Sequence, residues 1–184
     1  MRLCWIFFLR LLGWKIKGSF PEDLKKAIVI VAPHTSNWDF IVGLAVRSSL
    51  KLYRFRFLGK HSLFKKPWGF FFTRLGGIPV DRSDKHDMVN QVVNLFNRNE
   101  NFILALSPEG TRKKVERLKT GFYHIAKKAA VPIMMIGMDY AKKEISFAEP
   151  FYPTEDMEAD MRHIIQHFSG MAGKNPSQGL GDLY

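Results

Sequence analysis

The sequence has only one cysteine, Cys4, among its 184 residues. A disulfide within the chain is therefore excluded, and a reducing compartment is the simpler expectation. The chain also lacks an apolar run of the roughly 20 residues that a membrane-spanning helix needs. Acidic residues are scarce, because 17 Asp and Glu stand against 28 Lys and Arg, which gives a formal charge of +11. We therefore expect a polyanionic partner, such as nucleic acid, anionic lipid or a phosphorylated small molecule.

The remaining composition is that of a globular protein, with 46% hydrophobic and 24% charged residues. A chain of this length folds as one ordinary domain that is large enough to enclose an active site. The sequence contains no internal repeat, low-complexity tract or long linker. We therefore expect one folded domain over residues 20–184, preceded by a distinct N-terminal segment over residues 1–19.

The N-terminal segment is apolar from Leu3 to Trp14, apart from Arg10 and one glycine, and Lys15 and Lys17 follow it. As a helix, these twelve residues would extend about 18 Å, whereas the hydrocarbon core of a bilayer is about 30 Å thick. The segment therefore predicts a helix that lies in one leaflet, with its tryptophans and cations at the headgroups. A cleaved signal peptide is disfavoured by Arg10 and by the lack of a small-residue cleavage site, while an ordinary core helix stays open.

Apolar periodicity predicts strands and helices that alternate along the chain. Continuous Val- and Ile-rich runs predict buried strands, and apolar stripes at spacings of three and four predict helices. We therefore expect an α/β fold with an at least partly parallel sheet, whose chemistry lies at the carboxyl ends of strands. The predicted strands are 27–32, 55–58, 78–80, 102–106, 133–138 and 145–148. The predicted helices are 39–50, 67–75, 88–96 with Ser83 or Asp84 as cap, 121–130, and 155–168 led by Thr154.

The first polar motif, His34 to Asp39, directly follows a predicted strand. On a regular helix these two side chains would point about 140° apart, so only a turn can bring them together. An aspartate bonded to one imidazole nitrogen would fix the tautomer and leave the other nitrogen free to accept a proton. A structural alternative also fits, because Ser36 and Asp39 match a helix capping box.

A second motif runs from Gly76 to Arg82 and places an arginine at the exit of a strand. The planar guanidinium of Arg82 matches a phosphate bidentately, so this side chain is a candidate for binding an acceptor phosphate near His34. A solvated arginine at a strand end is the alternative interpretation.

A third motif, Ser107 to Arg112, again follows a strand. Gly110 lets the backbone approach a ligand, and Glu109 can accept hydrogen bonds from hydroxyl groups. The cations that follow are candidates for binding the phosphates of a thioester carrier, although a solvated charged loop is also possible. These cations are Lys113, Lys114, Arg117 and Lys119.

Taken in order, these stretches resemble the glycerolipid acyltransferases of the lysophosphatidate (1-acylglycerol-3-phosphate) acyltransferase type. The H-x4-D motif of that family matches His34 and Asp39, and its second motif matches residues 77–82. Its P-E-G-T-R and V-P-[IV] motifs match residues 108–112 and 131–133. Four ordered blocks across about 100 residues are far more specific than any single block.

The resemblance implies a single-domain acyltransferase fold with a mixed, largely parallel sheet flanked by helices. It implies a peripheral or monotopic protein on the cytoplasmic face of a membrane, with a lysophospholipid acceptor and with acyl-CoA or acyl carrier protein as co-substrate. We expect no cofactor, metal or nucleic-acid partner. The resemblance assigns catalysis to His34 and Asp39, and acceptor binding to Arg82, Glu109 and Gly110. We also expect Thr111 and Arg112 to bind substrate, and Lys113, Lys114 and Lys119 are candidates for contacts with the donor phosphates.

Three residues depart from the family pattern and leave the acceptor open. Pro33 stands where asparagine is common, Pro79 interrupts the second motif, and Ser107 replaces a usual phenylalanine. The predicted reaction is attack of an acceptor hydroxyl, deprotonated by His34, on an acyl thioester. The alternatives are an acyltransferase for another lipid, such as an ornithine lipid, a thioesterase, and, more remotely, a basic nucleic-acid-binding module. The last of these lacks any RNA-binding fingerprint.

Overall fold

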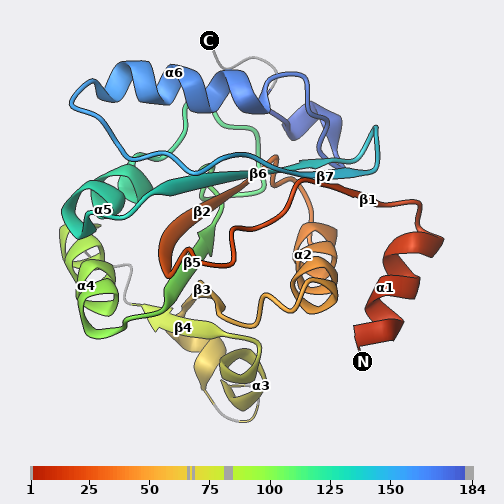
Figure 1. The fold of residues 1–184 in the computed structure, drawn as a ribbon, viewed down its shortest axis with the longest axis horizontal. Coiled ribbons are helices and arrows are strands. Elements are labelled where there is room, and N and C mark those ends of the chain that lie inside the picture. Colours follow the sequence, from red (N-terminus) through yellow and green to blue (C-terminus); the bar gives the residue numbers. More distant parts are fainter. Residues whose placement is uncertain (1, 66, 68, 81–84, 181–184) are drawn as a thin grey trace.

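The computed structural model of this chain describes residues 2–65, 67, 69–80 and 85–180. Its centre is a seven-stranded sheet with the order β1-β7-β6-β2-β5-β3-β4 (Figure 1). The strands from β6 to β4 run parallel to one another, whereas β7 is antiparallel to β6, and β1 is parallel to β7. The mixed, largely parallel α/β sheet predicted from the sequence is thus confirmed.

Strand β2 (Lys26–Ala32) lies at the centre of the sheet and shows why the domain has two layers of helices. Successive strand residues point to opposite faces, and this strand is apolar at nearly every position. Ala27 and Val29 pack with α1 (Arg2–Leu11) and α2 (Trp38–Ser49) on one face. Ile28 and Ile30 pack with α4, α5 and α6 on the other. The sheet is therefore covered on both faces, as parallel sheets require.

The other elements have the following bounds. The remaining strands are β1 (Lys15–Lys17), β3 (Phe55–Lys60), β4 (Gly77–Val80), β5 (Phe102–Leu106), β6 (Ile133–Asp139) and β7 (Glu144–Phe147). The remaining α-helices are α3 (Gly69–Arg74), α4 (Lys85–Arg98), α5 (Gly121–Ala129) and α6 (Met157–Phe168). Two short 3-10 helices, η1 (His61–Phe64) and η2 (Pro176–Gln178), complete the set.

The structure differs from the predicted elements in three places. Helix α6 begins at Met157 and is capped by Asp156, whose side chain accepts a hydrogen bond from the Ala159 N–H, so the prediction that Thr154 leads this helix is wrong. Helix α3 is shorter than the predicted helix 67–75, and the 3-10 helix η1, which precedes it, was not predicted. Strand β1 was not predicted, because Lys-Ile-Lys contains no apolar run. The predicted caps of α4, Ser83 and Asp84, lie outside the described residues.

The N-terminal segment contains both α1 and β1. Helix α1 lies beside α2, and its first residue, Arg2, donates a hydrogen bond from Nε to the Ser49 carbonyl at the end of α2. Leu9 is buried in the core, whereas Leu3, Phe7 and Leu11 form an exposed stripe at helical spacing. Among the described residues, the helices are all too short or too polar to cross a bilayer.

Candidate active site

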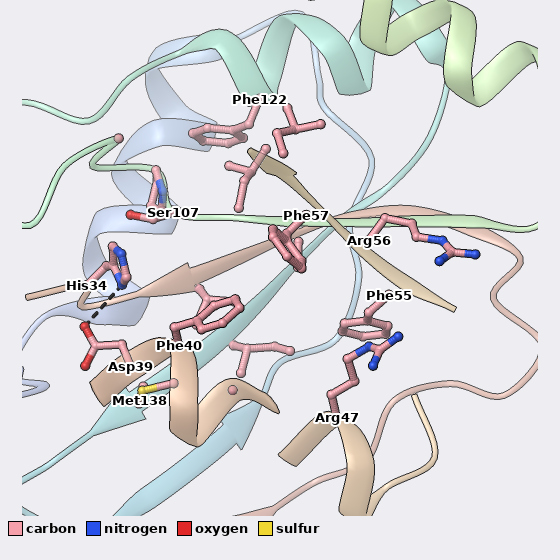
Figure 2. Close-up of a pocket in the computed structure, with 18 of the residues that line it drawn as sticks. His34, Asp39, Phe40, Arg47, Phe55, Arg56, Phe57, Ser107, Phe122 and Met138 are labelled. Carbon is pink, nitrogen blue, oxygen red and sulfur yellow. Dashed lines mark ion pairs between the residues drawn. The ribbon is translucent and has the colours of Figure 1, made fainter. Parts of the chain in front are cut away.

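His34 and Asp39 meet at the carboxyl end of β2, where the strand turns into α2. The Nδ1 atom of His34 lies 3.1 Å from Oδ2 of Asp39, and Figure 2 shows the two groups facing each other. The histidine side chain is 30% exposed, while the aspartate side chain is only 3% exposed. A turn has therefore brought together two side chains that a continuous helix would separate. With Nδ1 directed at the carboxylate, Nε2 is the nitrogen left for a substrate.

The same carboxylate also closes the turn. Its Oδ2 atom accepts hydrogen bonds from the backbone N–H groups of Thr35 (2.7 Å) and Ser36 (2.8 Å). Asp39 thus accepts the hydrogen bond from the Ser36 N–H that the predicted capping box requires, although the residue that caps α2 is Asn37. The structural and the catalytic interpretations of Asp39 are therefore compatible, because one carboxylate satisfies the turn and orients the imidazole.

Tyr140 is a third partner of this pair, and sequence reasoning missed it. Its hydroxyl donates a 2.7 Å hydrogen bond to Oδ1 of Asp39. Burial raises the pKa of Asp39, but hydrogen bonds from His34, Ser36 and Tyr140 outweigh it and hold the pKa below its ordinary value. Burial and the neighbouring carboxylate raise the pKa of the Tyr140 hydroxyl. Asp39 is therefore held as an anion beside the imidazole, and Tyr140 is held as a neutral donor.

Glu109 fixes the backbone of the histidine from the neighbouring strand end. Its Oε1 atom accepts a 2.8 Å hydrogen bond from the His34 N–H, and its Oε2 atom accepts a 2.5 Å hydrogen bond from the Ser107 hydroxyl. Burial raises the pKa of Glu109, and those two hydrogen bonds offset only part of the effect. Because Glu109 is 1% exposed and both oxygens accept bonds from the chain itself, the geometry favours positioning of His34. Its predicted contact with the acceptor stays a prediction.

The C-terminal segment closes the other side of the histidine turn. Asn175 donates two hydrogen bonds to Thr35, one from its backbone N–H to the hydroxyl and one from its side chain to the carbonyl. Gly173 lies so close that an added Cβ would be 2.5 Å from the Thr35 methyl group. Segments 140 residues apart in sequence therefore pack without a gap behind the turn, which restrains the position of His34.

A pocket of about 780 Å³ extends from His34 along α2 to the far end of that helix. Figure 2 shows the histidine and aspartate at one end of the pocket, and two arginines at the other. Phe40 and Phe57 lie between these ends, with their rings edge to face at a centroid distance of 5.4 Å. The lining between the ends is otherwise largely aliphatic and aromatic, from Leu44, Leu58, Phe122, Ile136 and Met138.

The predicted binding residues of the third motif divide into two groups. Gly110, Thr111, Arg112 and Lys119 line the pocket near His34, and Gly110 has the positive φ of 67° that favours glycine. Arg112 also donates a hydrogen bond to the Asn37 side chain, across the pocket mouth. The second group, Lys113 and Lys114, is exposed and lies outside the pocket lining. The predicted phosphate ligand Arg82 falls outside the described residues.

The pocket is therefore an apolar channel with cations at its mouth, beside His34. Within residues 2–65, 67, 69–80 and 85–180, no group of three or more His, Cys, Asp or Glu side chains is arranged to hold a metal ion. The arrangement offers one imidazole base, one buried carboxylate and a long apolar surface. Such a combination suits deprotonation of a hydroxyl beside an acyl chain.

Comparison with known proteins assigns the family. The model of the family named Acyltransferase matches residues 15–139, and the chain therefore belongs to the acyltransferase family. Among solved structures, the chain is similar to the 1-acyl-sn-glycerophosphate (LPA) acyltransferase PlsC from Thermotoga maritima. The TM-score is 0.59 and the identity 16%, over 91% of this chain and 74% of that one. Among curated proteins, no significant match is found.

Proposed function

We propose that this protein transfers an acyl group from a thioester, acyl-CoA or acyl carrier protein, to a hydroxyl of a lysophospholipid. The preferred acceptor is 1-acylglycerol-3-phosphate, which would yield phosphatidate. The observation that carries this proposal is the placement of His34, whose Nδ1 is engaged by Asp39 while the ring lines the end of a long apolar pocket. Membership of the acyltransferase family and the PlsC-like fold support the same reaction class.

The reaction needs a base but no strong acid. Nε2 of His34 takes the proton of the acceptor hydroxyl as the oxygen attacks the thioester carbonyl, and Asp39 stabilises the resulting imidazolium. The tetrahedral intermediate then collapses, the carbon–sulfur bond breaks, and the thiolate leaves. A thiol of pKa near 8.5, by analogy with cysteine, is a good leaving group, and the imidazolium returns the proton to it. The products are an ester and a free thiol, without an acyl-enzyme.

Charge at the catalytic mouth supports an anionic acceptor or carrier. Arg112 and Lys119 both line the pocket near the histidine, and the exposed Lys113 belongs to the same loop. In the described part of the chain, the ion pairs of this site comprise only that between His34 and Asp39. Arg112, Lys113 and Lys119 form no ion pair with a described carboxylate, so their charges can bind the phosphate groups of an acceptor or a carrier.

We further propose that the protein binds to the cytoplasmic face of a membrane through α1. The exposed stripe of this helix is strongly apolar, with Leu3 76%, Phe7 66% and Leu11 71% exposed. Such a stripe next to Arg10 and Lys15 is typical of a helix that lies in the headgroup region of one leaflet. Replacing Leu3, Phe7 and Leu11 by serine is expected to release the protein from anionic vesicles in a sedimentation assay. Unchanged binding would refute this mode of attachment.

Release of free thiol tests the reaction directly. The protein is given one acyl-CoA with a panel of lysolipids, and thiol release is followed with and without each acceptor. Transfer predicts release that requires an acceptor, whereas release without any acceptor would identify a thioesterase. A preference for a lyso-ornithine lipid would correct the acceptor. His34→Ala is expected to reduce kcat by at least about a hundredfold, the range for a lost general base. The matched control is His61→Ala, which removes an exposed imidazole from η1.

A further inference from the structure

Two guanidinium groups line the pocket at the end remote from His34 (Figure 2). Arg47 belongs to the last turn of α2, and Arg56 belongs to β3. Both side chains meet beside Gly76, since the Nη2 atom of Arg47 and the Cδ atom of Arg56 lie within 4 Å of the position that a Cβ on Gly76 would occupy. Arg47 lies eight positions after Asp39 on α2, which places its backbone about 12 Å along the helix axis from that of Asp39.

These two cations have no counter-charge in the described part of the chain. Neither forms an ion pair with a carboxylate among those residues. Arg47 donates one hydrogen bond, from Nη2 to the Tyr53 carbonyl at 2.9 Å, and its Nε is buried without a partner. Burial and the adjacent Arg56 lower the pKa of Arg47. Two like charges held side by side repel each other, and an anion bound between them would relieve that repulsion.

Arg47 lies over the Tyr53 ring, and exposed apolar side chains lie at the end of α2 and on α3. Leu50 and Tyr53, which follow α2, are 36% and 52% exposed, and Phe70 and Phe71 on α3 are 77% and 54% exposed. The hydrogen bond from Arg2 to the end of α2 brings the start of α1 to the same region. In Figure 1 the start of α1, the end of α2 and α3 all lie in the lower part of the view. Cations among exposed aromatic and aliphatic side chains are typical of a surface that contacts lipid headgroups.

We propose that Arg47 and Arg56 bind the phosphate of an anionic membrane phospholipid at the far end of the pocket. The exposed apolar side chains Leu50 and Tyr53 at the end of α2 favour a lipid over a soluble anion, because a soluble anion gains nothing from contact with them. This site lies at the end of the pocket remote from His34. Binding of a headgroup there would orient the protein with that end facing the bilayer. The proposal rests on the proposed binding of the protein to a membrane. It adds a defined site for one lipid headgroup to the general attraction between a basic protein and an anionic membrane.

Vesicle binding tests this site. The full chain is sedimented with vesicles of phosphatidylcholine alone or of phosphatidylcholine mixed with phosphatidylglycerol. Arg56→Gln is the primary variant, because the Arg56 side chain is exposed and makes no hydrogen bond among the described residues, so we expect folding to stay intact. Binding to the mixed vesicles is expected to weaken about fivefold for this variant, and about 30-fold when Arg47→Gln is added. Binding to phosphatidylcholine alone is expected to change less than about twofold.

A control variant removes two cations from the opposite face of the sheet, with Lys128→Gln and Arg162→Gln on α5 and α6. Both residues are exposed, and this pair is expected to cost less than about threefold in binding. An equal loss in the two double variants would overturn the proposal, because it would indicate a long-range field without a site. Unchanged binding after Arg56→Gln and Arg47→Gln would also overturn it.

Inorganic phosphate serves as the competing probe. Binding of phosphate in the absence of vesicles that is lost in Arg56→Gln, together with vesicle binding that the two arginine changes leave intact, would assign the site to soluble phosphate and overturn the lipid assignment. Displacement of the wild-type protein from the mixed vesicles by phosphate at constant ionic strength, lost in Arg56→Gln, supports a lipid phosphate at this site. These measurements follow binding and not turnover, so a failure of thiol release would refute the proposed reaction and leave this result unaffected.

Discussion

Replacement of Tyr140 by phenylalanine removes one hydroxyl and leaves the ring in place. That ring packs edge to face against Trp14 at a centroid distance of 4.9 Å, a contact that phenylalanine retains. The change therefore isolates the 2.7 Å hydrogen bond to Asp39. A hydrogen bond to a charged group contributes about 1.5 to 3 kcal/mol, and Asp39 is only 4% exposed, so water cannot replace the lost donor. We expect the free energy of unfolding at neutral pH to fall by about that amount.

The effect should depend on pH with a defined sign. The pKa of Asp39 is lowered in the folded protein, so its contribution to stability is present above its ordinary pKa of 3.8 and is lost as the pH falls through the lowered value. The difference between wild type and Tyr140→Phe should therefore narrow on acidification. The pKa of Tyr140 is raised, so its own contribution is present below its ordinary pKa of 10.0 and is lost as the pH rises through the raised value.

Urea unfolding, followed by tryptophan fluorescence at pH values from below 3.8 to above 10.0, measures the free energy of unfolding that Tyr140→Phe loses. The control is Tyr152→Phe, because Tyr152 is 65% exposed and its hydroxyl makes no hydrogen bond among the described residues. A less restrained carboxylate should also reduce kcat about tenfold, equivalent to about 1.4 kcal/mol in the barrier, with little change in KM. If Tyr140→Phe unfolds and turns over like Tyr152→Phe, the hydroxyl does not hold Asp39 and the reasoning fails.

Three further changes test the surroundings of the site. Glu109→Gln preserves an acceptor for the His34 N–H but removes a carboxyl group whose contribution to stability is lost as the pH rises through its raised pKa. In urea unfolding, the variant should therefore gain stability relative to wild type as the pH rises from the ordinary pKa of 4.5 through the raised value. Gly43→Phe should place a ring in the pocket, because Gly43 lines the pocket and nothing lies within 4 Å of its Cβ position, and it should shift the acyl-CoA preference to shorter chains. Gly43→Ala is the control and should retain the wild-type chain-length profile. Gly173→Ala should cost about 1 to 3 kcal/mol of stability in thermal unfolding, because its Cβ would overlap the Thr35 methyl group, and an unchanged Tm would contradict that packing.

The core of the fold could be predicted because its strands are buried on both faces. Strand β5 was predicted with its exact observed bounds, Phe102–Leu106, and the predicted start of β6 at Ile133 is also the observed one, because a fully buried parallel strand is apolar at every position. The contact between His34 and Asp39 followed from a turn directly after such a strand. Strand β1 is different, since all three of its residues are exposed and it joins the sheet by pairing its backbone with β7.

The partners of the His34–Asp39 pair could be predicted only in part. Tyr140 directly follows β6, the neighbour of β2, so the rule that chemistry gathers at carboxyl strand ends contained a signal for it. Its bond to a residue 101 positions away, however, depends on strand order, which periodicity does not give. The contact of Asn175 with Thr35 depends on the path of the C-terminal loop. The arginine pair depends on the packing of α2 against β3, which the sequence also leaves open.

The pairing of β1 with β7 limits how the N-terminus can be altered. A chain shortened to begin after Lys17 would lose α1 together with Lys15–Lys17, and β7 would then become the edge of the sheet with its backbone unpaired. An unprotected edge strand promotes self-association. Such a chain would also lack the Trp14 ring that abuts Tyr140. Insolubility or inactivity after truncation would thus reflect a damaged sheet, and point changes on the outer stripe of α1 are the sounder way to separate anchoring from catalysis.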